Sequence, residues 1–366
     1  MGKQKVIISQ QLEQSIATAV SECEHDRTFI LADETTEKLC LPLIAGLPCL
    51  RGVQIITIGA TDHNKTLASL SHVWTELQHG GATRHSLLVN LGGGMVTDLG
   101  GFAASTFKRG INFINIPTTL LAMVDASVGG KTGINFGGLK NEIGVFSNAS
   151  SVILDTTFLH TLDHENILSG YAEMVKHGLI ADDGTWAELV NFDLDVPDYH
   201  QLSRMLEDSV KVKERIVDED PKEKGLRKAL NLGHTIGHAF EAFALHTTSP
   251  GSPGSPNSPN IPVRPILHGY AVAYGLVCEL YLSSIKTSFP VAKMRQTVSF
   301  INEHYGRLPI TCDDYPTLLE LMTHDKKNTA GQINFTLLGD VGDIRINQTA
   351  TAKEIEEALD FYREAH

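Results

Sequence analysis

Two histidines four residues apart, His234 and His238, lie in the segment NLGHTIGH, whose neighbourhood otherwise has the apolar composition of a buried helix. Each residue of an α-helix advances about 100° around its axis, so Arg227, Asn231 and both histidines would form one narrow polar stripe. Leucine, isoleucine and phenylalanine would cover most of the remaining circumference. A polar stripe on a buried helix must face a polar partner, whereas on a solvated helix the two histidines would lie at the surface.

A glycine precedes each of these histidines. Glycine destabilises a helix interior by roughly 1 kcal/mol relative to alanine. Gly233 and Gly237 therefore indicate that a neighbouring backbone or a ligand approaches this segment closely.

Two histidines do not complete a metal site, and this pair lacks the glutamate of the HExxH zinc proteases. Further ligands are available in SGYAEMVKHG, which contains Glu173, and in ILHGYAVAYG, where His268 precedes a predicted helix. A set of two histidines and one glutamate leaves a coordination position open, which is typical of catalytic zinc. His177, four residues after Glu173, competes as a ligand by spacing, and residue types alone leave that choice open.

A glycine-rich segment, NLGGGMVTDLGGF at residues 90–102, follows one apolar run and precedes another. Backbone amides at such a strand-to-helix junction can bind a pyrophosphate. The match to GxGxxG is incomplete because Thr97 occupies the third glycine position, so a tight turn without a ligand explains the segment equally well. VGGKTG at 128–133 resembles the end of a P-loop, but Asp125 replaces the glycine that a P-loop requires.

The elements that must position these residues follow from hydrophobic periodicity. Short apolar runs separated by helix-length segments predict a parallel sheet covered by helices; they lie at residues 5–9, 28–33, 53–59, 86–92, 111–117 and 151–155. After about Phe158 amphipathic helices dominate, with one strand-like pair near the C-terminus. We therefore expect a Rossmann-like α/β domain at 1–158 and a mainly α-helical domain at 159–366. Residues 247–265, rich in serine, proline and glycine, are expected to form a flexible loop.

Composition excludes several classes of protein. A length of 366 residues favours two domains, and no apolar run reaches the roughly 18 residues that span a bilayer. A net charge of −13 without a lysine- or arginine-rich run argues against a nucleic acid partner. Five scattered cysteines without a CxxC pair and the absence of an N-terminal secretory signal lead us to expect a cytoplasmic protein.

Seven motifs together resemble the 3-dehydroquinate synthase family of sugar-phosphate cyclases. In chain order they read GGGMVTDLGGFAASTFKRG, IPTTLLAMVDASVGGKTGIN, GLKNEIG, GYAEMVKHG, RKALNLGHTIGHAFE, LHGYAVAYG and HDKKN. The resemblance implies conversion of 3-deoxy-D-arabino-heptulosonate 7-phosphate to 3-dehydroquinate and phosphate, a step of the shikimate pathway towards aromatic amino acids. It implies transient oxidation by NAD, β-elimination of phosphate, re-reduction and an intramolecular aldol closure.

The resemblance also implies which residues act. Zinc, which cobalt can replace, would be bound by Glu173, His234 and His268, so that His177 becomes an ordinary helix residue. NAD would be bound by Asp33, Asp62, Lys65, Gly93, Gly94, Asp98, Thr118, Thr119 and Lys140. The sugar phosphate would be held by Asp125, Lys131, Asn141, Lys176, Lys213, Arg227, Asn231, His238 and either Lys326 or Lys327, with Arg109 reaching across from the second subunit of a homodimer.

This sequence departs from the family pattern at two positions. Asp62 replaces the usual glutamate, which weakens the expected ribose contact. Tyr270 follows HisGly, where glutamate is frequent, so a contact beside His268 is altered.

Three other functions share parts of the pattern. A metal-dependent alcohol dehydrogenase resembling glycerol dehydrogenase would not need phosphate and carboxylate contacts such as Lys131, Lys213 and Arg227. A sister cyclase whose substrate lacks a carboxylate would not need Lys213 with Arg227. A binding protein that has lost turnover would not need the complete ligand set that this chain retains.

Overall fold

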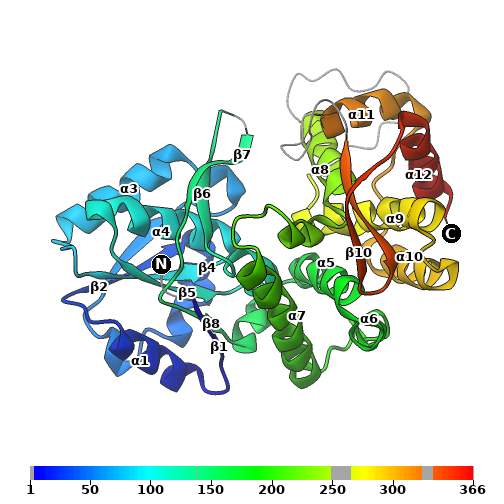
Figure 1. The fold of residues 1–366 in the computed structure, drawn as a ribbon. Coiled ribbons are helices and arrows are strands. Elements are labelled where there is room, and N and C mark those ends of the chain that lie inside the picture. The colour runs from blue at the N-terminus through cyan, green and yellow to red at the C-terminus, as the bar shows by residue number, and fades with distance from the viewer. Residues whose placement is uncertain (1–3, 138, 249–264, 324–332, 366) are drawn as a thin grey trace. The chain divides into compact units, whose positions relative to one another are not determined.

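The computed structural model describes residues 4–137, 139–248, 265–323 and 333–365 (Figure 1). Its contacts divide the chain into two compact units, Met1–Gly170 and Tyr171–His366, and each is described below by itself. The domain division expected at 158/159 stays a prediction. Lys326, Lys327 and most of the predicted loop at 247–265 lie outside the described residues.

Six parallel strands form the core of the first unit (Figure 1). They are β1 (Lys5–Ile8), β2 (Thr28–Asp33), β3 (Gln54–Ile58), β4 (Leu87–Gly92), β5 (Asn112–Pro117) and β8 (Ser151–Leu154), in the order β1-β8-β5-β4-β2-β3. Every residue of β4 and β8 is buried. Strands buried on both faces appear in a sequence as continuous apolar runs, and the predicted parallel sheet is confirmed.

Helices and a separate hairpin complete the first unit. The helices are α1 (Leu12–Glu22), α2 (Glu34–Leu39), α3 (Leu67–His79) and α4 (Gly94–Thr106), with short turns η1 (Leu41–Leu43), η2 (Pro48–Leu50), η3 (Asp62–Asn64), η4 (Phe107–Arg109), η5 (Ala122–Ala126) and η6 (Thr156–Thr161). Strands β6 (Lys131–Phe136) and β7 (Leu139–Phe146) pair antiparallel. This hairpin was not predicted, because β7 is exposed along its whole length and β6 is only partly buried, so neither strand has the apolar run of a buried strand.

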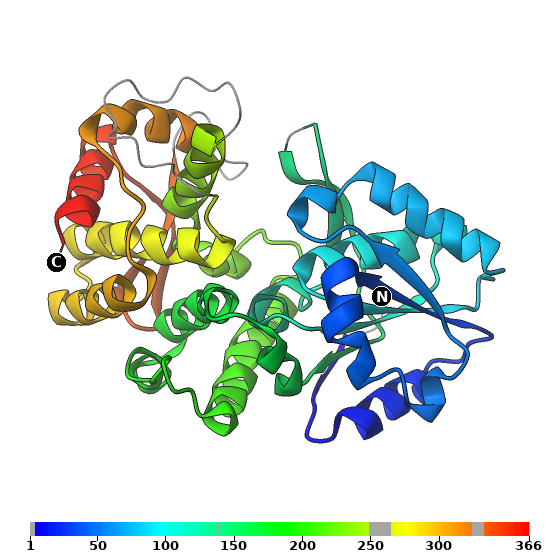
Figure 2. The same cartoon turned by 180° about the vertical axis from the view of Figure 1, so that it is seen from behind.

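The second unit is mainly helical, as predicted. Its elements are most of α5 (His164–Ala181), then α6 (Asp183–Val190), α7 (Tyr199–Glu219), η7 (Leu226–Asn231), α8 (His234–Thr248), α9 (His268–Thr287), α10 (Val291–Tyr305), η8 (Cys312–Asp314), α11 (Tyr315–Thr323), β9 (Asn334–Asp340), β10 (Asp343–Thr349) and α12 (Ala352–Glu364). Helix α9, yellow in Figure 2, packs against α8, α10, α12 and β9. None of the described helices combines the length and apolarity needed to cross a membrane.

The predicted continuous helix through Arg227 and His238 is wrong. The chain forms the 3-10 helix η7, leaves helical geometry at Leu232, whose ψ is 129°, and starts α8 only at His234. Gly233 takes a φ of +81°, in the left-handed region that favours glycine. Arg227 therefore lies on a separate element and does not continue the helix face of the two histidines.

Glycines bring the backbones of α8 and α9 into direct contact. A Cβ atom on Gly275 would lie 1.9 Å from the carbonyl oxygen of Gly233, and one on Gly237 would lie 2.7 Å from that of Ala271. The close approach predicted at Gly233 and Gly237 is confirmed, and the neighbour is the backbone of α9.

Candidate metal and cofactor sites

Glu173, His234 and His268 come together within the second unit, each from a different helix. Glu173 Oε1 lies 3.5 Å from Nε2 of His234 and 3.6 Å from Nε2 of His268. Ligand atoms arranged tetrahedrally at about 2.1 Å from zinc lie about 3.4 Å apart. Both distances to the carboxylate therefore suit ligands of one such ion, and ligand atoms of the two histidines lie within 4.8 Å of each other.

Both imidazoles are anchored at Nδ1, which leaves Nε2 directed towards the carboxylate. Nδ1 of His234 hydrogen-bonds with the carbonyl oxygen of Leu232 at 3.1 Å, and Nδ1 of His268 with Glu241 Oε2 at 3.2 Å. An acceptor at Nδ1 fixes the tautomer that presents Nε2 as a metal ligand.

The carboxylate of Glu173 is fully buried. Among the described residues, neither of its oxygens receives a well-aligned hydrogen bond, although Lys176 forms an ion pair with Oε2. Burial raises the pKa of Glu173, but the ammonium of Lys176 and the two histidines outweigh burial, so this pKa lies well below its usual range. A buried, ionised carboxylate that faces two imidazoles fits a divalent cation.

The electrostatics of His268 depend on its two acidic neighbours. Burial lowers the pKa of His268, but the carboxylates of Glu173 and Glu241 outweigh burial and raise this pKa to about 10. Since a metal binds neutral imidazole, an ion at this site would displace the proton.

The two remaining histidines differ in their surroundings. His238 is exposed, but its ring nitrogens come within 4.8 Å of ligand atoms of both His234 and His268, so it borders the same centre. His177 is completely buried, and its Nδ1 hydrogen-bonds with the hydroxyl of Ser209 on α7 at 2.7 Å.

The candidate carboxylate-binding residues, Lys213 and Arg227, are both buried, and they lie on α7 and η7, which pack against each other. Arg227 Nη1 donates a hydrogen bond to the carbonyl oxygen of Pro221 at 2.9 Å. Asn231 Nδ2 donates to Glu223 Oε1 at 3.0 Å. Buried cations are typical of sites that bind anions.

In the first unit, the glycine-rich turn lies at the carboxyl ends of β4 and β5. Gly93 precedes α4, and the amide of Thr118 donates to the carbonyl oxygen of Gly92 at 3.0 Å. A Cβ atom on Gly93 would lie 3.2 Å from Thr119 Cγ2, and one on Gly94 would lie 3.0 Å from the Cβ of Ala126. The first amides of α4 therefore lie next to both threonines, where a parallel sheet binds a dinucleotide.

Three candidate residues from different segments of the first unit form one cluster. Lys65 Nζ donates to Asp98 Oδ2 at 2.5 Å and also to Asn141 Oδ1. Lys65 is only 3% exposed. The tertiary structure thus joins two residues assigned to NAD with one assigned to the phosphate.

The remaining candidates of the first unit make other contacts, and one of them adjoins this cluster, since the amide of Lys65 donates to the carbonyl oxygen of Asp62 at 3.1 Å. Asp33 caps α2 by accepting hydrogen bonds from the amides of Thr35 and Thr36. Asp62 Oδ2 lies 3.8 Å from Lys140 Nζ. Asp125 is part of η5, and both Lys131 on β6 and Arg109 at the end of η4 are exposed.

Comparison with known proteins identifies the family. The family models for the N-terminal and C-terminal parts of 3-dehydroquinate synthase match residues 55–169 and 170–328. The chain belongs to the 3-dehydroquinate synthase family. A 3-dehydroquinate synthase of Parabacteroides distasonis is 54% identical over 365 residues, which cover 100% of this chain and 99% of the relative. One from Oceanobacillus iheyensis is 37% identical over 341 residues, with coverages of 92% and 89%.

Solved structures share the fold at lower identity. A 2-epi-5-epi-valiolone synthase from Streptomyces hygroscopicus, with NAD+ and Zn2+ bound, has a TM-score of 0.82 at 24% identity and covers 100% of this chain and 98% of that one. A 2-deoxy-scyllo-inosose synthase complexed with carbaglucose-6-phosphate, NAD+ and Co2+ has a TM-score of 0.81 at 22% identity, with coverages of 99% and 96%. A probable glycerol dehydrogenase from Sinorhizobium meliloti also has this fold, with a TM-score of 0.57 at 14% identity and coverages of 99% and 97%. The fold alone therefore does not separate cyclases from dehydrogenases.

Tyr270, one of the two departures from the 3-dehydroquinate synthase pattern, packs into an aromatic cluster. Its ring centroid lies 5.2 Å from that of Tyr305 and 6.3 Å from that of Tyr274. The carboxylate beside Nδ1 of His268 is that of Glu241, from another helix. At the second departure, Asp62 Oδ2 accepts a hydrogen bond from Asn135 Nδ2 at 3.0 Å.

Glu241 and Glu279 were not among the candidates predicted from the sequence. Glu241 lies seven residues, about two helical turns, after His234 and therefore on the same face of α8. Glu279 is an acidic residue in the long apolar run of α9. Its helical spacing from His234 could have identified Glu241. The single charge in an apolar run could have identified Glu279.

Proposed function

We propose that this protein is a 3-dehydroquinate synthase that converts 3-deoxy-D-arabino-heptulosonate 7-phosphate to 3-dehydroquinate and phosphate with NAD and a divalent metal ion, zinc or cobalt. The observation that carries the proposal is the convergence of Glu173, His234 and His268 at the spacing of metal ligands in a chain of this family. When bound, NAD supplies reversible hydride transfer and the metal ion supplies Lewis acidity.

Residues of the second unit would bind and orient the substrate. Buried Lys213 and Arg227 would hold its carboxylate, because paired cations bind a carboxylate with directional hydrogen bonds. Lys176, Asn231 and His238 would contact hydroxyl and phosphate oxygens. Lys176 also pairs with Glu173, which keeps that carboxylate ionised.

Residues of the first unit would bind NAD and the phosphate. The amides at the N-terminus of α4 would donate hydrogen bonds to the pyrophosphate. The hydrogen bonds of Lys65 with Asp98 and Asn141 would hold these neighbouring side chains in place. Lys131 and Asn141, together with Lys326 or Lys327 of the second unit, would neutralise charge on the departing phosphate. The NAD contacts would be completed by Asp33, Asp62, Thr118, Thr119 and Lys140. Asp125 would contact a hydroxyl group of the substrate.

We further propose that the enzyme is a homodimer in which Arg109 acts in the site of the partner subunit. Lys108 and Arg109 have φ values of 48° and 68°, and strained backbone of this kind is concentrated at functional sites. The hairpin β6–β7 also exposes Phe136, Leu139, Ile143, Val145 and Phe146. An apolar surface of this kind would be covered by a second copy of the chain.

We also propose a cytoplasmic location. All five cysteines are free in the structure, which suits a reducing compartment. The small-molecule sugar phosphate is the partner that this function requires.

The test is a phosphate-release assay on purified protein with NAD+, zinc and the heptulosonate phosphate. We expect release of phosphate and formation of 3-dehydroquinate without net accumulation of NADH, and loss of both after chelation. Undiminished turnover by metal-free protein would overturn the proposal. NADH accumulation with a simple polyol would favour the dehydrogenase alternative, and equal turnover of a sugar phosphate without a carboxylate would favour a sister cyclase.

A further inference from the structure

Glu279 of α9 is a completely buried carboxylate that caps the N-terminus of α8. Its Oε2 accepts a hydrogen bond from the amide of Gly233 at 2.6 Å. Its Oε1 accepts from the amides of Thr235 and Ile236 at 2.9 and 3.1 Å. Amides at the start of a helix lack partners within that helix, so a side chain from α9 satisfies those of α8.

The residue before α8 cannot provide this cap itself. Helices usually begin with serine, threonine, aspartate or asparagine, whose side chain accepts from the first amides. Here the position is Gly233, which has no side chain. Its φ of +81° and the 2.9 Å that would separate an added Cβ from Leu276 Cγ disfavour any larger residue. The cap therefore has to come from another element.

We propose that Glu279 is a positioning residue that holds the metal ligand His234 in register with His268. His234 is the first residue of α8 and lies between the residues whose amides Glu279 binds, and His268 is the first residue of α9. This inference rests on the metal-dependent function proposed above.

The packing of α8 against α9 explains why polar contacts are needed to fix the register of the two helices. Gly233, Gly237 and Gly275 bring backbone against backbone, so this surface has few side-chain ridges to interlock and fix the register. Polar contacts hold both ends instead. Glu279 of α9 binds the start of α8, and Glu241 of α8 hydrogen-bonds with His268 at the start of α9.

The negative charge of Glu279 also favours a cation beside His234. The N-terminus of a helix carries a partial positive charge of about half a unit, which disfavours a cation beside His234. The buried carboxylate offsets this charge. Glu279→Gln preserves the side-chain volume. It keeps one acceptor oxygen but removes the charge and the second oxygen, so it tests the helix cap and the charge compensation together.

The experiment compares Glu279→Gln with Ser283→Ala. Ser283 is buried one turn further along α9, but its hydroxyl accepts from the amide of Leu338 on β9 and not from α8. We expect Glu279→Gln to weaken zinc affinity about tenfold or more and to alter the absorption spectrum of the cobalt-substituted protein. Ser283→Ala should lower the melting temperature but retain the wild-type affinity and spectrum.

Unchanged affinity and spectrum in Glu279→Gln, or an equal loss in Ser283→Ala, would overturn the inference. Hydrogen exchange on wild-type, metal-free protein tests it without a variant, since the amides of Gly233, Thr235 and Ile236 should be as protected as the interior of α8. Rapid exchange at these amides would also overturn it. Wild-type protein that binds no zinc would overturn the proposed function as well, whereas normal wild-type binding with an unaffected Glu279→Gln variant would overturn only the role of Glu279.

Discussion

The carboxylate of Glu241 lies 3.2 Å from Nδ1 of His268, while Nε2 of the same ring faces Glu173 at 3.6 Å. The imidazole is thus held between two acidic groups from different helices. Such carboxylate–histidine pairs orient metal ligands and raise their basicity. The ring of His268 is oriented by tertiary structure and not by its own helix alone.

Glu241→Gln should weaken zinc binding about ten- to a hundredfold, because the amide is a poorer acceptor for the Nδ1 proton and carries no charge. Competition with a chromophoric chelator measures this affinity. Glu303→Gln, at an exposed position of α10, is the matched control and should bind zinc normally. Equal affinities in the two variants would show that Glu241 does not support His268.

Glu173→Gln should abolish stoichiometric metal binding and phosphate release. It should also lower the free energy of unfolding by about 3–5 kcal/mol, since Lys176 would remain buried without its ion-pair partner. Metal analysis and urea unfolding measure the two effects. In the double variant Glu173→Gln/Lys176→Met, the free energy of unfolding should largely recover, while metal binding stays absent. Metal binding by this double variant would exclude Glu173 as a ligand.

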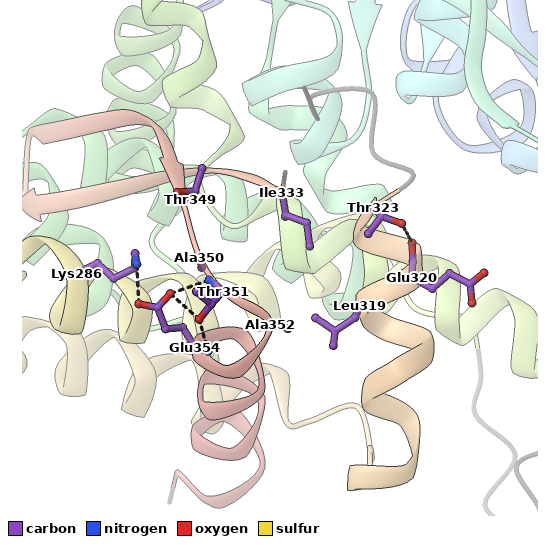
Figure 3. Close-up of a pocket in the computed structure, with 10 residues that line it drawn as sticks. All are labelled: Lys286, Leu319, Glu320, Thr323, Ile333, Thr349, Ala350, Thr351, Ala352 and Glu354. Atoms are coloured by element: carbon purple, nitrogen blue, oxygen red, sulfur yellow. Dashed lines mark hydrogen bonds and ion pairs between the residues drawn. The ribbon is translucent and has the colours of Figure 1, made fainter. Parts of the chain in front are cut away.

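The ion pair between Glu354 and Lys286, shown in Figure 3, should contribute to stability only above acidic pH. Hydrogen bonds from Lys286 and from the amide of Thr351 lower the pKa of Glu354 from 4.5 to about 2. A carboxyl whose pKa is lower in the folded state contributes fully above its unfolded pKa and loses that contribution as the pH falls through the folded value. Because the pair is partly exposed, we expect less than about 1 kcal/mol.

The corresponding measurement is urea unfolding of the wild type and Glu354→Gln between pH 6 and pH 2. The difference in the free energy of unfolding should shrink as the pH falls below about 4.5. Glu356→Gln, at an exposed position of the same helix, should differ from the wild type by an amount that does not depend on pH. If the difference in the free energy of unfolding between the wild type and Glu354→Gln did not change with pH, the lowered pKa of Glu354 would be wrong.

Arg109→Ala and Glu173→Gln should complement each other if sites are shared between subunits. A mixed dimer then has one site with both defects and one with neither, so random mixing restores about one quarter of wild-type activity. Phosphate release after co-refolding the two inactive variants measures this recovery. If Arg109 serves the site of its own subunit, the mixture should remain as inactive as the separate variants.

The predictions that succeeded concern elements with a strong local signal. The strands β2, β4, β5 and β8 of the parallel sheet are almost entirely buried, so each appears as an apolar run. The hairpin β6–β7 was missed because β7 is exposed and β6 is only partly buried, so neither strand has that run. The break before α8 was also missed, because periodicity cannot show that Gly233 adopts a left-handed φ.

The sequence by itself determined the family, the parallel-sheet and helical parts of the fold, and the chemical types of the proposed metal ligands, since apolar runs and ordered motifs are properties of the chain alone. The tertiary structure decided which atoms meet. Glu173, His234 and His268 lie on three helices that are distant in sequence, and their 3.5–3.6 Å spacing arises from how those helices pack. Likewise, the caps and acidic partners supplied by Glu279 and Glu241 depend on contacts between helices, which local sequence patterns do not encode.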